Sequence, residues 1–225
     1  MKKLFKITIF ILLLACVDDS AHGPYGSDNT PPGVVDINEV VNTPGGAIIY
    51  FTPPNDLDLL YVKASFTDEN EIDREVIVSS VIDSLSIVGF AEQGNYPVDV
   101  FAVDRGESES EAVQVTISPL EAPIHAILNS MVGTQDFGGI NIAYQNPTRA
   151  EVSLNMSTID DEGNIVFRES FYTSQADSYY SFRGYDAEPT IFVIYVEDKW
   201  GNQTTTRSFE ITPLEDIFLD KEFWA

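Results

Sequence analysis

Residues 96–104, with the sequence YPVDVFAVD, decide the fold, because apolar and polar residues alternate along them. A period of two places successive side chains on opposite faces of a β-strand. Residues 113–117 (VQVTI) alternate in the same way, and residues 191–196 (IFVIYV) are an apolar run of strand length. The turn sequences DEGN at 161–164 and KWGN at 199–202 punctuate such runs. The pattern predicts short antiparallel strands in sandwiches, and no stretch shows a sustained helical period with capping residues.

The chain repeats itself at an offset of 94 residues. Residues 115–121 (VTISPLE) align with residues 209–215 (FEITPLE), and Asp104 aligns with Asp198 at the same offset. A repeat of this length corresponds to a whole domain and not to a solenoid unit. We therefore expect two β-sandwich domains, one at residues 34–121 and one at residues 122–215.

The N-terminus indicates export. Three lysines precede an apolar run at residues 7–15 that is too short to span a bilayer, and the chain's single cysteine, Cys16, follows it. The sequence LLAC at residues 13–16 resembles the lipobox of bacterial lipoproteins. This resemblance implies that the signal peptide, residues 1–15, is removed and that Cys16 carries acyl chains that anchor the protein in a membrane. The alternative is an ordinary secretory signal followed by a free thiol.

The segment that follows the cysteine indicates where in the cell the protein is located. Asp18 and Asp19 resemble the acidic signal that sends lipoproteins of Bacteroidota to the outer face of the outer membrane. Residues 16–33 are rich in Asp, Ser, Gly and Pro and have too little apolar content to fold, so they form a flexible acidic tether. We expect a lipid-anchored outer-membrane protein that faces the cell exterior.

The charge of the chain excludes some partners. There are 12 Lys and Arg against 36 Asp and Glu. Loss of the three signal lysines leaves nine basic residues and a net charge of −27. Such a surface repels nucleic acid and anionic lipid, so we expect no nucleic-acid partner.

The strand patterns carry a family resemblance. Residues 96–104 are similar to the F strand of fibronectin type III domains, in which the tyrosine at the strand start hydrogen-bonds back to the preceding loop. Residues 85–90 (LSIVGF) look like the E strand just upstream. In the second copy Thr190 stands where Tyr96 stands, so this tyrosine corner is lost there. The expected fold class is all-β, with two tandem immunoglobulin-like or fibronectin type III-like β-sandwiches after the signal peptide and tether.

The arrangement of lipobox, tether and two sandwiches also resembles cell-surface lipoproteins of polysaccharide-utilisation systems in Bacteroidota. In that family a discoidin-like domain commonly follows the pair, and residues 216–225 would be a tail or the start of such a domain. The resemblance implies a non-enzymatic protein that binds polysaccharide, or other proteins of a glycan-uptake system. Two alternatives remain: a spacer that presents a C-terminal module, and an adhesin or docking subunit that binds a protein and exposes a contiguous apolar patch.

Residues for catalysis or metal binding form no recognisable motif. His22 lies in the tether and His125 in the expected first strand of the second copy, so a nucleophilic triad lacks its parts. Residues 160–164 (DDEGN) are rich in oxygen ligands but lack the alternate spacing of an EF-hand loop, so a hairpin turn is favoured over calcium binding. We expect no enzyme activity, no catalytic residues, no cofactor and no metal.

Aromatic residues are the candidates for glycan binding, because a sugar ring presents C–H groups that stack on an indole or phenol. Trp200 lies in a turn beside Lys199 and Asn202, which can meet sugar hydroxyls. Tyr179 and Tyr180 form a second candidate cluster, although alternating aromatics on a strand more often pack in the core. Trp200 has an alternative role as well, which is to cover the edge of the sandwich.

Overall fold

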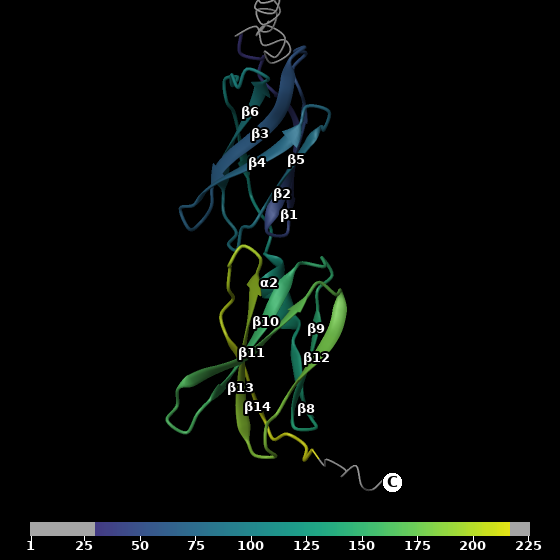
Figure 1. The fold of residues 1–225 in the computed structure, drawn as a ribbon, viewed down its shortest axis with the longest axis vertical. Coiled ribbons are helices and arrows are strands. Elements are labelled where there is room, and N and C mark those ends of the chain that lie inside the picture. Colours follow the sequence, from purple (N-terminus) through teal and green to yellow (C-terminus); the bar gives the residue numbers. More distant parts are fainter. Residues whose placement is uncertain (1–29, 217–225) are drawn as a thin grey trace, which may run out of the picture.

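The computed structural model describes residues 30–216 (Figure 1). The signal peptide, Cys16 and most of the tether, as well as the tail from residue 217 onward, lie outside the described residues. β-strands dominate the described part, as the alternating pattern predicts. Within residues 30–216, no helix is both long enough and apolar enough to cross a membrane.

Strands β1 to β7 form one body, which we call the first sandwich. Its two sheets have the orders β1-β2-β5 and β4-β3-β6-β7. The alternation that opened the sequence analysis directs Val98, Val100 and Ala102 of β6 into the core between the sheets. The strands are β1 (Asp36–Thr43), β2 (Gly46–Thr52), β3 (Leu59–Thr67), β4 (Asp73–Ser79), β5 (Ser84–Val88), β6 (Tyr96–Asp104) and β7 (Val113–Ile117).

Helix α2 and strands β8 to β14 form the second sandwich, which has a separate core. Its sheets have the orders β12-β9-β8 and β11-β10-β13-β14. The elements are α2 (Pro123–Ser130), β8 (Val132–Asp136), β9 (Gly139–Gln145), β10 (Val152–Ile159), β11 (Ile165–Thr173), β12 (Asp177–Arg183), β13 (Thr190–Asp198) and β14 (Arg207–Ile211).

The two sandwiches share one topology. In each, strands one, two and five make one sheet and strands four, three, six and seven make the other. The fourth strand pairs with the third, whereas in constant immunoglobulin domains it lies in the sheet of the first, second and fifth strands. The expected all-β fold class is confirmed, and Figure 1 shows the sandwiches arranged end to end along the long axis.

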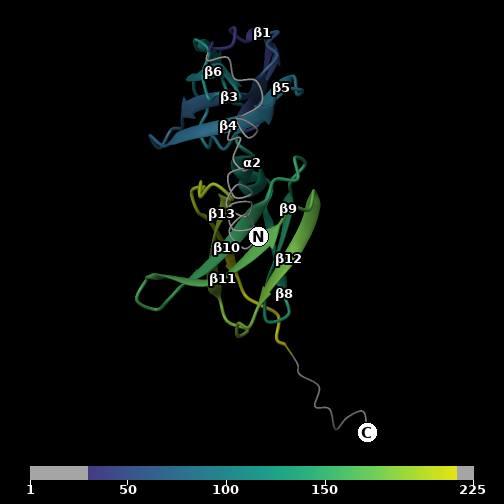
Figure 2. The ribbon, with the colours of Figure 1, turned by 45° about the horizontal axis from the view of Figure 1, so that its top comes forward.

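One expectation about secondary structure is wrong. Residues 123–130, in which His125 was expected to lie on a strand, form helix α2. Pro123 stands in the first turn, where its missing N–H costs nothing. Ile124, Ile127 and Leu128 recur at helical spacing and are buried in the second core. Both ribbon views place α2 between the two sandwiches (Figures 1 and 2).

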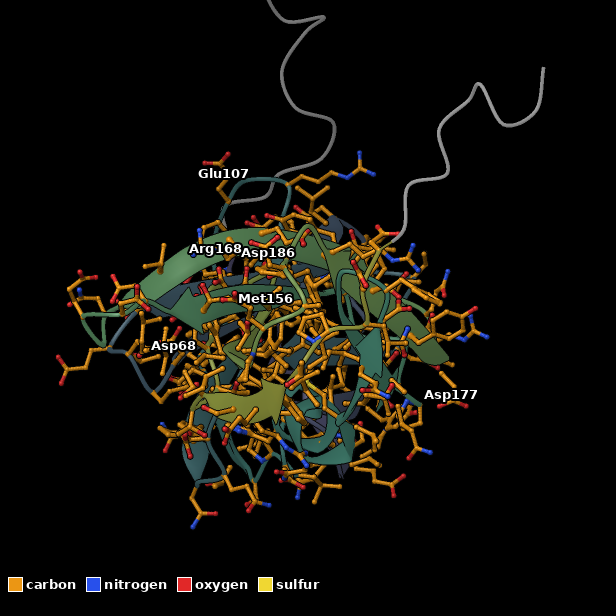
Figure 3. All side chains as sticks on the ribbon, turned by 90° about the horizontal axis from the view of Figure 1, so that it is seen from below. Asp68, Glu107, Met156, Arg168, Asp177 and Asp186 are labelled. Atoms are coloured by element: carbon orange, nitrogen blue, oxygen red, sulfur yellow. The ribbon has the colours of Figure 1, made fainter. Side chains whose placement is uncertain are left out.

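Most acidic side chains lie at the surface. The view along the long axis shows Glu107 and Asp177 projecting from the outline of the molecule, whereas Met156 lies within it (Figure 3). Asp68 is an exception, since it is buried. Burial alone would raise the pKa of Asp68, but hydrogen bonds from Ile72 N and from Arg74 Nε hold that pKa below its ordinary value.

The tyrosine corner is present in the first sandwich. Tyr96 Oη donates a hydrogen bond to Glu92 O at 3.1 Å, and its ring lies 4.3 Å from that of Phe90. At the corresponding position of the second sandwich, Thr190 Oγ1 donates to Glu188 O at 3.0 Å. A hydroxyl therefore ties the strand start to the preceding loop in both copies, but only Tyr96 adds an aromatic ring at this position.

Replacing Tyr96 with phenylalanine removes this hydrogen bond and keeps the ring. Tyr96→Phe should lower the free energy of unfolding by about 1 kcal/mol, because the Glu92 carbonyl loses its donor. Urea denaturation followed by circular dichroism measures the change. Tyr61→Phe, at a half-buried tyrosine on β3, is the control and should be close to neutral. Equal losses in the two variants would contradict a specific role of the corner.

Candidate functional site

The turn that follows β13 is organised by Asp198. Its Oδ1 accepts hydrogen bonds from the backbone N–H groups of Trp200 and Asn202 at 2.9 and 3.0 Å, and its Oδ2 accepts one from Asn202 Nδ2 at 2.9 Å. Gly201 takes a φ of 85°, which few other residues adopt. The sequence prediction of a turn at residues 199–202 is thus confirmed, and the carboxylate determines where Trp200 and Asn202 point.

This turn contacts the first sandwich at Gly89, and we call the contact the joint. Asn202 Nδ2 donates a hydrogen bond to Gly89 O at 2.9 Å, and Asn202 is only 6% exposed. A Cβ placed on Gly89 would lie 3.2 Å from Trp200 Cγ, so the indole packs directly on the glycine. The structure therefore gives Asn202 a position between the sandwiches, where its amide is already engaged.

Trp200 keeps part of its surface free. It is 36% exposed, and Lys199 Nζ lies 4.9 Å from the centroid of its ring. Lys199 also makes a salt bridge to Glu151, with 3.0 Å between Nζ and Oε2. The indole is consequently held by the glycine of one sandwich and by the ammonium group of the other.

A groove of about 950 Å³ lies beside this turn on the outer face of sheet β11-β10-β13-β14. We call it the Tyr172–Trp200 groove. Tyr172, on β11, is 78% exposed. The lining of the groove includes Ser153 and Asn155 from β10, Tyr172 from β11, Glu197 from β13, and the turn residues Lys199 and Trp200.

The floor of the groove is low because β10 carries small polar residues on its outer face. Ser153 lies opposite both Tyr172 and Glu197, so long side chains stand on either side of a short one. Asn155 Nδ2 donates to Ser153 Oγ at 2.9 Å, and Ser170 Oγ donates to Asn155 Oδ1 at 2.5 Å. The floor is thus a hydrogen-bonded polar strip flanked by an aromatic side chain and an acid.

The two tyrosines of β12 lie elsewhere. They belong to sheet β12-β9-β8, and the structure does not bring them to Trp200. Tyr179 is 70% exposed on the outer face of that sheet. Tyr180 points inward and stacks on Phe171 at 3.9 Å between ring centroids. Tyr180 therefore packs against the core. This is the role that the sequence analysis gave as the alternative to glycan binding.

Sequence reasoning missed Tyr172 and the floor residues. Tyr172 alternates with Phe171, which packs against the core, so period two alone predicts that Tyr172 faces outward. The pairing of β11 with β10 that places Tyr172 opposite Ser153 depends on register, which the sequence does not display.

The acidic residues 160–164 are the stretch that the sequence analysis weighed for calcium. Within residues 30–216, no group of three or more His, Cys, Asp or Glu side chains is arranged to hold a metal ion. Residues 160–164 form the expected turn between β10 and β11, in which Asp160 Oδ1 accepts a hydrogen bond from Asn164 N at 2.7 Å. That bond is the main reason why the pKa of Asp160 lies below its ordinary value.

Comparisons with known proteins found two domain-family models and several solved structures that are similar to parts of this chain. The model of a domain of unknown function, DUF4959, matches residues 32–119, and that of another, DUF5126, matches residues 120–222. A SusE-like protein of known structure shows 28% identity with a TM-score of 0.35, and the match covers 40% of this chain but only 30% of that protein. A search of curated proteins found no match.

Two animal structures cover most of the chain. A segment of two fibronectin type III domains from chicken tenascin shows 11% identity with a TM-score of 0.35, covering 81% of this chain and 99% of the segment. The chicken interferon gamma receptor alpha chain shows 11% identity with a TM-score of 0.33, covering 82% of this chain and 99% of the receptor chain. The strand orders of the two sheets in each sandwich are those of an all-β protein built from immunoglobulin-like or fibronectin type III-like β-sandwiches.

The joint yields a testable prediction about Gly89. A valine there places a side chain 3.2 Å from Trp200 Cγ, so Gly89→Val should separate the indole from the first sandwich. In a Trp224→Phe background Trp200 is the chain's single tryptophan, and quenching of its fluorescence by acrylamide reports its exposure. We expect quenching to increase.

Gly184→Val is the matched control for this variant. Gly184 has a φ of 103° against 107° for Gly89, so both valines strain the backbone alike, but a Cβ on Gly184 meets no atom of residues 30–216 within 4 Å. Quenching in the control should match that in the parent. Equal increases in both variants would show that strain, and not the lost contact, exposes Trp200.

Proposed function

We propose that this protein is a surface lipoprotein, anchored through Cys16 in the outer membrane, that captures glycan in the Tyr172–Trp200 groove without catalysing a reaction. The lipobox-like sequence and the acidic residues after Cys16 support the location. The groove supports the binding role. The observation that carries it is an exposed tyrosine and a partly exposed tryptophan at the borders of one polar floor.

The chemistry of the groove fits a sugar chain. Aromatic side chains offer flat apolar surfaces to the C–H faces of sugar rings, and polar side chains meet the hydroxyls. Glu197 and Gln175 line the groove together with the aromatics and have carboxylate and amide groups for this purpose. The groove lies on a sheet face and is open to solvent, which suits a stretch of polymer better than a fully enclosed small molecule.

The charges of the groove favour a neutral glycan. Glu151, Glu197 and Asp198 outnumber Lys199 in its lining, and the amino group of Lys199 is already paired with Glu151. Because the whole chain is acidic as well, uronic acid or sulfated polymers would be repelled. Neutral polysaccharides are therefore the class to test first.

The organisation along the chain follows from the same proposal. Residues 1–15 would be removed as the signal peptide, residues 16–33 would form the lipidated tether, and the domains would span residues 34–121 and 122–215. The 17 residues from 17 to 33 reach at most about 60 Å when extended. The groove, which lies on the second sandwich, would then stand well away from the lipid surface.

Cys16→Ser tests the anchor. Serine has no thiol to take a lipid, so the variant should lose lipid labelling and appear in the soluble fraction or remain unprocessed. Fractionation of cells grown with a labelled fatty acid measures both effects. Ser20→Ala, four residues away, is the control and should stay in the membrane fraction. A Cys16→Ser protein that still carries lipid would end the lipoprotein proposal.

Tyr172→Ala tests the groove. Loss of an aromatic side chain that stacks on the ligand costs on the order of 2 kcal/mol, which is about a thirtyfold loss of affinity. Retention in gels that contain neutral polysaccharides measures binding. Tyr179→Ala removes an equally exposed tyrosine from the other sheet of the same sandwich and should bind like the parent. Because both side chains are exposed, both variants should melt near the temperature of the parent.

Two results would contradict glycan binding in this groove. One is an equal loss of binding in both tyrosine variants. The other is a parent that binds no polysaccharide in a broad panel, which would favour the spacer or the docking subunit. For the docking alternative, the exposed Leu57, Leu60 and Val81 lie at one end of the first sandwich, where β3 begins and β4 ends, and would be the surface to test.

A further inference from the structure

The polar floor of the Tyr172–Trp200 groove continues along β10 beyond the groove. Strand β10 places Ser153, Asn155 and Ser157 on its outer face, because Leu154 and Met156 between them point into the core. The three outward residues are only 7%, 5% and 5% exposed, although they face away from the core. These short side chains therefore lie below the level of longer neighbours on β11 and β13.

Each of the three floor residues lies opposite one aromatic residue. On β11, Tyr172 pairs with the first floor residue and Phe167 pairs with the third. On the other side, Tyr195 of β13 pairs with the second. The aromatic residues thus alternate between the two flanks of the floor. We call the three floor residues together with these three aromatics the β10 strip.

A β-bulge in β11 turns Phe167 toward solvent. Tyr172 faces outward, and an unbroken alternation from it would send Phe167 into the core. The register of β11 against β10 shifts between Met156 and Ser157, so that Arg168 is skipped and Phe167 lies opposite Ser157. Phe167 is consequently 58% exposed. The bulge therefore holds a second exposed ring on the same face as Tyr172.

The strip is longer than one sugar ring. The partners of Tyr172 and Phe167 lie four residues apart on β10, which corresponds to about 13 Å along an extended strand. A single pyranose ring cannot contact both aromatics, whereas several linked rings can. Because the floor follows one strand, a chain that contacts both aromatics has to be extended.

The linkage chemistry of glycans then selects a class. Equatorial β-1,4 linkages give a straight, ribbon-like chain, whereas α-1,4 linkages give a curved, helical one. Successive rings of the ribbon are turned over, so that it offers C–H faces to both of its sides. Aromatics that alternate between two flanks match such a chain, because a ring stacks on whichever flank its face meets.

The outer part of the strip carries no charge. From Asn155 onward, away from the Trp200 turn, the neighbours on β11 and β13 are Ser170, Tyr195, Phe167 and Val193. The acid Glu197 lies only at the inner end, opposite Ser153. Nothing in this outer part pairs with an anionic or cationic substituent, so a neutral chain fits it best.

We propose that the β10 strip binds an extended, neutral, β-1,4-linked glycan that runs along β10 and stacks on both Tyr172 and Phe167. This inference rests on the proposed function, and it adds the class of glycan, the direction of the chain and a second stacking residue outside the groove. The chain crosses the polar floor between the two rings, where Asn155 and the serines meet its hydroxyls.

Isothermal titration calorimetry with oligosaccharides of increasing length tests the class and the length of the ligand. The probes are β-1,4-linked gluco-, manno- and xylo-oligosaccharides, from disaccharides to octasaccharides, and α-1,4-linked gluco-oligosaccharides of the same lengths are the comparison. In at least one β-1,4-linked series the affinity should rise until the chain spans both aromatics. The α-1,4-linked series should show no such rise.

Phe167→Ala tests the second stacking residue. The variant should bind the longest oligosaccharide of that series about tenfold more weakly, and its affinity should stop rising at a shorter chain length. Phe167→Tyr keeps a ring and should bind like the parent. Phe137→Ala is the matched control, since Phe137 is 53% exposed in the turn between β8 and β9 of the other sheet. Because the ring of Phe167 is exposed, Phe167→Ala should melt near the temperature of the parent.

The outcomes separate this inference from the proposed function. If Tyr172→Ala loses binding while Phe167→Ala binds long chains like the parent, the groove stands and the strip is overturned. A parent that is retained by a neutral polysaccharide but binds no β-1,4-linked oligosaccharide overturns the class of glycan. A parent that is retained by no polysaccharide contradicts glycan binding itself. An affinity that rises with length only while Phe167 or a tyrosine is present supports the inference.

Discussion

The carboxylate of Asp198 is the group on which the arrangement of this molecule depends. It accepts hydrogen bonds from the backbone of Trp200, from the backbone of Asn202 and from the Asn202 amide. These three bonds shape a turn that could otherwise take many conformations. Residues of this turn contact Gly89 and form one wall of the groove. One polar cluster thus connects the junction of the sandwiches with the surface proposed to bind glycan.

The first sandwich has an equivalent turn with an aspartate, but within residues 30–216 that turn makes no such contact with another sandwich. Asp104 stands where Asp198 stands, and its Oδ1 accepts a hydrogen bond from Ser108 N at 2.8 Å. Serine is too short to reach the other oxygen, and Asp104 Oδ2 is buried with no hydrogen-bond partner among the described residues. The turn also lacks a tryptophan. The repeat therefore preserved the fold of the turn, whereas the side chains that make the joint belong to the second copy.

The groove is likewise a property of the second copy. By strand pairing, Tyr61 of β3 occupies the position that Ser153 of β10 occupies in the second copy. Lys63 of β3 likewise occupies the position of Asn155. In the first sandwich these places on the outer face hold a tyrosine and a lysine. Lys63 Nζ lies 2.6 Å from Glu109 Oε1 and 5.2 Å from the centroid of the Phe101 ring, so it fills the space. Small residues at the same two positions of β10 leave the space open.

Local pattern determined much of this protein. Period two predicted the strands, the offset of 94 residues predicted two copies of one fold, and Gly201 beside Trp200 predicted a turn. The short helix α2 was missed although Ile124, Ile127 and Leu128 follow its period, because eight residues are too few to stand out against strand-length runs.

Only the tertiary structure decided what the candidate residues touch. Trp200 lies against a glycine 111 positions earlier in the chain, Asn202 is buried by the same contact, and Tyr172 faces a floor made by another strand. The alternation of a strand tells which side chains share a face, and this is local information. The neighbour of a face depends on strand register and on how two domains meet, and both are set by contacts between residues far apart in the chain.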